Sequence, residues 1–78
     1  MFGSLTLYST GACELCERAH RLLGSMPELQ NVTLDVVDIA DDELLLARYG
    51  ESIPVLAVAP GLELGWPFNA DDVLRLLG

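Results

Sequence analysis

The chain has 78 residues, of which 51% are hydrophobic, and this length suits one domain and not two. Twelve acidic residues stand against four arginines and no lysine, which gives a formal net charge of −8. This balance excludes a nucleic-acid partner, because phosphate neutralisation requires clustered basic side chains. We therefore expect one globular domain over residues 1–78, with a dense core.

The apolar runs at 5–8, 34–39 and 55–59 are far shorter than the roughly 20 residues of a membrane-spanning helix. Residues 1–4 carry no basic side chain and lead into no long apolar run, so we expect no signal peptide. Two cysteines in so short a chain do not suggest a disulfide scaffold. The expected protein is a cytoplasmic monomer that does not bind membranes.

The first half of the chain predicts one helix between two strands. Residues 5–8 form a short β-type run, which a turn at 9–11 ends. From 12 to 26 the apolar residues recur at helical spacing, and Gly24 marks the predicted end of the helix. Residues 32–39 are rich in valine and predict a second strand. Such a β-α-β unit forms a right-handed crossover with parallel strands.

The following segment predicts a second helix and a hairpin. The acidic residues 41–43 suit the start of a helix, and Gly50 suits its C-terminal cap. Residues 53–59 predict a third strand, and Pro60-Gly61 predicts a turn. Residues 62–64 alternate like a short return strand, so the two strands are expected to pair as an antiparallel hairpin.

A third helix is predicted near the C-terminus. Asn69 suits its N-cap, and Asp72 stands three residues later in capping-box position. Phe68 and Val73 are placed to form the flanking hydrophobic staple. The complete order is β-α-β-α-β-β-α, which predicts an α/β architecture with a four-stranded mixed sheet and helices on both faces.

The segment Cys13-Glu14-Leu15-Cys16 lies where the first strand leads into the first helix. Thiol exchange requires a thiolate, and the unpaired N–H groups at a helix start stabilise an anion. Cys13 is expected in the first turn, within reach of solvent, and Cys16 one turn further in on the apolar side. Residues three apart on a helix are neighbours, so the two sulfurs can meet. The spacing therefore predicts Cys13 as the catalytic nucleophile and Cys16 as the resolving thiol.

Four segments of the chain resemble glutaredoxins. Residues 13–19 resemble the segment in which a Cys-Pro-Tyr-Cys motif opens the first helix, and 36–39 resemble the second strand. Ser52-Ile53-Pro54 is similar to the Thr-Val-Pro loop, and 65–71 occupy the place of the Gly-Gly-Tyr-x-Asp segment. The resemblance covers essentially the whole chain. It implies a thioredoxin-like fold of glutaredoxin type and the thiol–disulfide oxidoreductase activity of a small bacterial glutaredoxin-like protein.

The resemblance also implies a substrate groove beside the cysteines. Pro54 is expected to follow a cis peptide bond and to shape this groove, and the backbone near Ile53 is expected to pair with a bound peptide or glutathione. The alternative interpretation is that Pro54 only starts an edge strand, where proline is tolerated. Trp66 either lines the groove or covers the edge of the small core, and the sequence leaves both interpretations open.

The expected substrate is a protein or small-molecule disulfide, with glutathione or thioredoxin reductase as the candidate reductant. Glutaredoxins commonly carry a lysine shortly before the first cysteine, and none precedes Cys13 here. Glu14 adds a negative charge inside the motif, and Trp66 stands where a glycine would let the backbone approach glutathione. These differences predict that glutathione binds poorly and that no cofactor is held.

Metal binding is the main alternative chemistry. Cys13, Cys16 and His20 fall nearly on one helical face, but structural zinc usually takes four protein ligands, so we predict no metal site. The alternative function is a non-catalytic binding or metal-binding module that keeps the thioredoxin fold with idle cysteines. Titration of the thiols separates the two, because a catalytic pair contains one reactive thiol.

Overall fold

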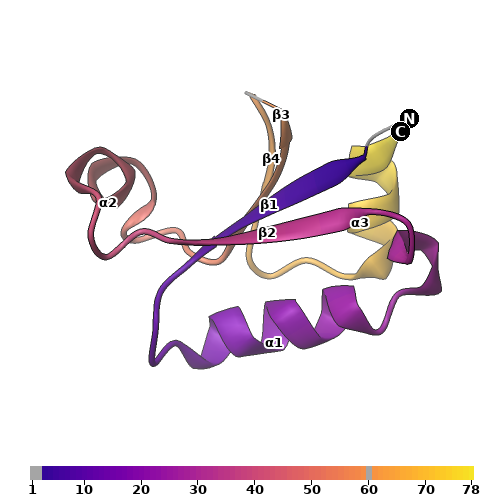
Figure 1. Cartoon of the computed structure of the whole chain (residues 1–78), viewed down its shortest axis with the longest axis horizontal. Helices are drawn as coiled ribbons and strands as arrows, with labels where there is room; N and C mark the ends of the chain where they lie inside the picture. The colour runs from indigo at the N-terminus through magenta and orange to yellow at the C-terminus, as the bar shows by residue number, and fades with distance from the viewer. Residues whose placement is uncertain (1–2, 60) are drawn as a thin grey trace.

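The computed structural model describes residues 3–59 and 61–78 (Figure 1). Its elements in chain order are β1 (Ser4–Ser9), α1 (Glu14–Gly24), a 3-10 turn η1 (Pro27–Leu29), β2 (Thr33–Asp38), α2 (Glu43–Tyr49), β3 (Val55–Ala59), β4 (Leu62–Gly65) and α3 (Ala70–Leu77). The strands form one sheet in the order β2-β1-β3-β4. β1 is parallel to β2, whereas the β1–β3 and β3–β4 pairs are antiparallel. The predicted element order, parallel pair and hairpin are confirmed.

The larger core lies between the sheet and the helices α1 and α3. Leu5 and Leu7 are each 1% exposed and point to this face, because alternate residues of a strand share a face. Ala19 and Leu23 of α1 meet them, and Val73 of α3 completes the cluster. Figure 1 shows α1 running along the underside of β1 and β2. Burying a leucine side chain contributes roughly 1.5–3 kcal/mol, so these residues dominate the stability of the sheet–helix contact.

The opposite face of the sheet carries a second, smaller cluster that α2 covers. Ile39, Tyr49 and Val55 are its buried members, and Tyr8 packs against them. Val55 belongs to this cluster and Leu56 to the larger one, because neighbouring residues of a strand point to opposite faces. Helices therefore lie on both faces of the mixed sheet, as predicted.

The predicted helix caps are confirmed. The Asp72 N–H donates to Asn69 Oδ1 over 2.9 Å, and the Asn69 N–H donates to Asp72 Oδ2 over 3.0 Å. Asp42 caps the start of α2, because its side chain accepts from the N–H groups of Leu44 and Leu45. Gly50 is the C-cap of α2, with φ −51° in the right-handed region. A Cβ on Gly50 would lie 2.5 Å from the Leu46 carbonyl oxygen, so this position has no room for a side chain.

Several elements differ from the predictions, including a third strand that begins at Val55 and not at 53. The first helix begins at Glu14 and not at 12, because Ala12 has φ 53°, outside the helical region. The 3-10 turn η1 was not predicted; Pro27 opens it, and its fixed φ suits the first helical position. The second strand is shorter than 32–39 and spans Thr33–Asp38.

Some predictions fall partly outside the described residues. Met1 and Phe2 belong to the N-terminal segment in which we expect no signal peptide, and they lie outside the described residues. Pro60, the first residue of the predicted turn Pro60-Gly61, also lies outside them. Gly61 itself has φ 83°, a conformation that favours glycine. Within residues 3–59 and 61–78, no helix combines the length and apolar character that crossing a membrane requires.

Candidate functional site

The cysteine motif lies at one end of the sheet, where β1 leads into α1. β1 ends at Ser9, and a short connection through Ala12 brings the chain to the helix. Cys13 is the N-cap of α1 and not part of its first turn, since its backbone is extended at φ −117° and ψ 108°. The Cys16 N–H lies 3.2 Å from Cys13 Sγ and donates to it. The N-terminus of α1 therefore directs an N–H group at this sulfur.

A disulfide bond joins Cys13 to Cys16, whose Cα atoms lie 5.2 Å apart. Cys13 is partly exposed, whereas Cys16 is only 5% exposed and packs inside α1. An incoming group therefore meets the outer sulfur of Cys13 first. This arrangement of one accessible and one buried sulfur is suited to a two-step thiol exchange.

Carboxylates dominate the first turn of the helix. Glu14 and Glu17 both lie there, and both side chains are exposed. Arg18 Nη2 pairs with Glu14 Oε1 over 3.4 Å, and both partners are largely in solvent. Exposed pairs of this kind contribute little to stability, roughly 0–1 kcal/mol. The N-terminus of α1 therefore favours negative charge on the sulfurs, whereas the two carboxylates disfavour it.

The residues expected to form the substrate groove come together at this same end. Tyr8 near the end of β1 pairs with Val55, so the segment that precedes Val55 lies at the disulfide end of the sheet. The Ile53–Pro54 peptide bond is cis, and Pro54 is buried. The Trp66 N–H donates to the Pro54 carbonyl over 3.2 Å, which joins the loops before β3 and after β4.

The side chains of these residues point in different directions. Ile53 packs against the smaller cluster under α2. Trp66 packs against the larger core and meets Phe68 edge to face, with ring centroids 5.2 Å apart. Trp66 is partly exposed, so it covers the core edge while keeping a free surface. The sequence did not predict the second cis peptide bond, Trp66–Pro67.

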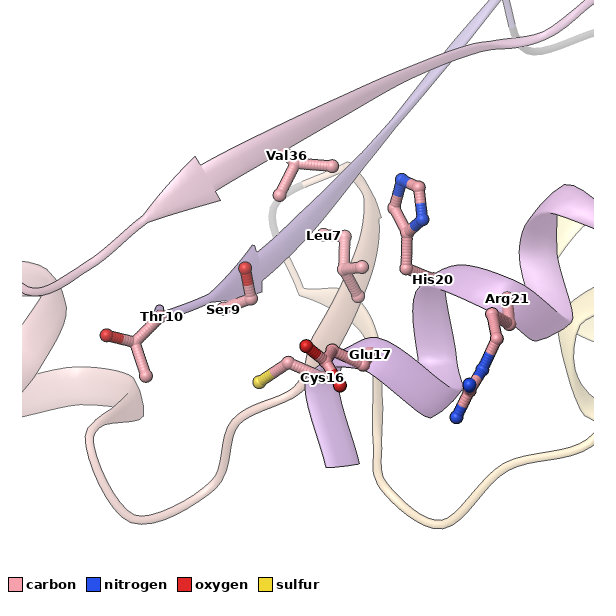
Figure 2. A pocket seen from close by; sticks show the side chains of 8 residues that line it. All are labelled: Leu7, Ser9, Thr10, Cys16, Glu17, His20, Arg21 and Val36. Carbon is pink, nitrogen blue, oxygen red and sulfur yellow. The ribbon is translucent and has the colours of Figure 1, made fainter. Parts of the chain in front are cut away.

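A pocket with a volume of about 480 Å³ adjoins the inner cysteine (Figure 2). Its lining residues come from β1, the connection after it, α1 and β2: Leu7, Ser9, Thr10, Cys16, Glu17, His20, Arg21 and Val36. Figure 2 shows His20 projecting from α1 toward the strands and Arg21 projecting away from them. Val36 is 50% exposed because β2 is an edge strand that α1 covers incompletely. Sequence reasoning missed this pocket, since only incomplete packing between the two elements creates it.

His20 was considered as a third metal ligand beside the cysteines. It lies on the surface of α1, in the wall of the pocket. Among residues 3–59 and 61–78, no group of three histidine, cysteine, aspartate or glutamate side chains is arranged to hold a metal ion.

The family model of the glutaredoxin-like domain (DUF836) matches residues 4–78, nearly the whole chain. The chain belongs to this glutaredoxin-like family. The family match agrees with the resemblance drawn from the cysteine motif and the Ser52-Ile53-Pro54 loop. No curated protein matches the sequence.

Two solved structures of one protein are similar to this glutaredoxin-like domain. They are an X-ray and a solution structure of the Northeast Structural Genomics target protein XcR50 from X. campestris. The X-ray structure is 37% identical, with a TM-score of 0.79, over 94% of this chain and 93% of that chain. The solution structure is 36% identical, with a TM-score of 0.76, over 99% and 92% respectively. The predicted thioredoxin-like fold is thereby confirmed.

Proposed function

We propose that this glutaredoxin-like domain is a thiol–disulfide oxidoreductase that uses Cys13 and Cys16 as its redox pair. The observation that carries the proposal is the disulfide at the start of α1, with an accessible outer sulfur and a buried inner one. Membership of the glutaredoxin-like family supports the same class of chemistry.

The reaction is a two-electron exchange in two steps. The Cys13 thiolate attacks one sulfur of a substrate disulfide, which forms a mixed disulfide and releases the first substrate thiolate. The Cys16 thiolate then attacks Cys13 Sγ, which breaks the mixed disulfide and releases the second substrate thiolate. The substrate has gained two electrons, and the enzyme has gained the Cys13–Cys16 bond. The hydrogen bond from the Cys16 N–H stabilises charge on Cys13 Sγ in the reduced state.

Ile53, Pro54 and Trp66 are assigned to substrate binding. The Ile53 N–H already donates to the Tyr49 carbonyl over 3.1 Å. We therefore assign pairing with a bound peptide to the Ile53 carbonyl. Pro54 places this backbone at the disulfide end, and the Trp66 N–H is hydrogen-bonded to the adjacent Pro54 carbonyl.

The electron donor is identified by measuring turnover with each candidate reductant separately. Either glutathione or thioredoxin reductase regenerates the dithiol, and the carboxylates of the α1 first turn favour the second, because glutathione is itself an anion. The measurement is turnover of a mixed-disulfide substrate with each donor in turn. Turnover sustained by glutathione at ordinary concentrations would contradict this assignment of the donor.

Two cysteine variants test the proposed activity. Cys13→Ser should abolish exchange, because it removes the attacking sulfur. Cys16→Ser should accumulate a mixed disulfide on Cys13, which mass spectrometry detects as the added mass of one substrate half. In the reduced wild-type protein, alkylation should label Cys13 before Cys16, since only Cys13 is accessible.

The two variants are matched controls for each other, because each removes one sulfur and the disulfide with it. Folding of both is checked by circular dichroism. If folded Cys16→Ser forms no mixed disulfide and both wild-type thiols resist alkylation, the domain is a binding module with idle cysteines and the proposed activity is wrong.

A further inference from the structure

The connections that follow β1 and β2 lie at the same end of the molecule. Ser9 and Asp38 are paired at the ends of these parallel strands. The Ile39 N–H donates to the Ser9 carbonyl over 2.9 Å, which keeps the two chains together beyond the strands. Figure 1 accordingly shows the start of α1 and the start of α2 at one end of the molecule, and η1 at the other. The disulfide is part of this end.

Exposed carboxylates are concentrated there. The acidic residues of the α1 first turn and of the β2–α2 connection are Glu14, Glu17, Asp38, Asp41, Asp42 and Glu43, and all six are exposed. Backbone N–H groups bind Asp38 and Asp42, but such hydrogen bonds leave the carboxylates charged. Arg18 of α1 pairs with Glu14 there, and Arg21, four residues after Glu17, lines the pocket beside Cys16. We call this surface, with the disulfide at its edge, the acidic end.

Two large apolar side chains are exposed at the acidic end. Leu15 lies between the two cysteines and is 42% exposed, and Leu44 in the first turn of α2 is 82% exposed. Leu15 therefore offers apolar surface directly beside the disulfide. At the first turn of α1, apolar surface from Leu15 and negative charge from Glu14 and Glu17 thus adjoin the disulfide.

We propose that the acidic end docks a protein partner whose reactive disulfide is flanked by lysine or arginine side chains. The inference rests on the proposed function and names its substrate class. The apolar part of such a segment contacts Leu15, and its cationic groups face the carboxylates. Complementary charge raises the rate of encounter and makes that rate dependent on salt.

The same charges act against anionic substrates. Glutathione carries two carboxylates and one amine, so its disulfide brings net negative charge to the acidic end. Glu14 and Glu17 lie on the first turn of α1 beside the disulfide, and salt screens charges over about 10 Å at 0.1 M ionic strength. Discrimination between cationic and anionic substrates should therefore be largest at low ionic strength.

Three synthetic peptides of equal length test the proposal. Each carries one cysteine in mixed disulfide with the same aromatic thiol, and the cysteine is flanked by lysine, glutamine or glutamate. The rate at which the reduced domain releases the aromatic thiol is followed at low and at high salt. We expect the lysine peptide to react at least ~10-fold faster than the glutamate peptide at low salt, with the glutamine peptide between them. High salt should reduce this ratio several-fold.

A matched pair of double variants assigns the effect to the acidic end. Glu17→Gln with Asp41→Asn removes two carboxylates there, and should lower the lysine-to-glutamate rate ratio several-fold. Glu28→Gln with Asp35→Asn removes the same charge from η1 and from the middle of β2. This control should keep the wild-type ratio, because its charges lie away from the disulfide.

The outcomes distinguish the docking proposal from the proposed function. If the wild-type domain reduces all three peptides at equal rates at low salt, the docking proposal is overturned and the oxidoreductase remains. Equal ratios in the two double variants would also overturn it, because net charge alone would then explain the preference. If the folded, reduced domain releases no aromatic thiol from any peptide, the oxidoreductase proposal is wrong and the docking proposal falls with it.

Discussion

The rings of Tyr8 and Tyr49 stack with their centroids 4.4 Å apart and their planes at 18°. Tyr49 is 6% exposed, and its hydroxyl donates a hydrogen bond to Glu63 Oε2. Arg48 Nη2 lies 3.7 Å from the same carboxylate oxygen. Through these contacts α2 is attached to β1 and to β4, and it thereby holds the segment that leads to Pro54 at the disulfide end.

We expect the contribution of Tyr49 to the free energy of unfolding to be lost at alkaline pH. The hydrogen bond to Glu63, together with burial and the nearby Glu63 charge, raises the pKa of Tyr49 from 10.0 to about 12. As pH rises above about 10, the unfolded chain loses this proton before the folded protein does. The contribution of Tyr49 is therefore complete below about pH 10 and is lost as the pH approaches about 12.

The Tyr49→Phe variant tests this pH dependence. The chain has no lysine and, in the disulfide form, no free thiol, so few other groups change charge in this pH range. Urea unfolding across this range should show a smaller alkaline loss of unfolding free energy for Tyr49→Phe than for the wild type. An identical loss in both proteins would contradict the prediction.

The capping box of α3 predicts a measurable stability difference. Asn69→Ala removes the acceptor for the Asp72 N–H and should lower the free energy of unfolding by about 1 kcal/mol. Asp71→Asn is the matched control, because Asp71 lies in the same exposed first turn but outside the capping box. Urea denaturation measures both. The interpretation fails if Asn69→Ala is no more destabilising than Asp71→Asn.

We expect substitutions at Gly11 and Ala12, which directly precede Cys13, to change the stability of the fold in opposite directions. Ala12 has φ 53°, so Ala12→Val places a β-branched residue in the left-handed region and should cost roughly 1–2 kcal/mol. At Gly11 a Cβ would meet no atom within 4 Å and φ is not positive. Gly11→Ala should therefore stabilise the fold by about 0.4–1 kcal/mol, by restricting the unfolded chain. Thermal unfolding that ranks the two variants in the reverse order would contradict this.

Features that depend on a few neighbouring residues were predictable from the sequence. The capping box of Asn69 and Asp72 spans three positions, and the cysteine motif spans the same distance. The alternation of Leu5 and Leu7 was sufficient to indicate a strand with one buried face. Short-range patterns of this kind reflect local backbone geometry, which each segment carries with it.

Contacts between distant segments were decided only when the elements packed together. The Tyr49–Glu63 hydrogen bond joins residues 14 positions apart, and neither residue shows a local pattern that predicts it. The pocket beside Cys16 exists because the edge strand leaves Val36 half-exposed next to α1. Whether two such groups meet, or leave a cavity, depends on angles and spacings between layers that hydrophobic periodicity does not encode. Periodicity identifies which face of a helix is buried. The shape of the surface against which that face packs is determined by the other elements of the fold.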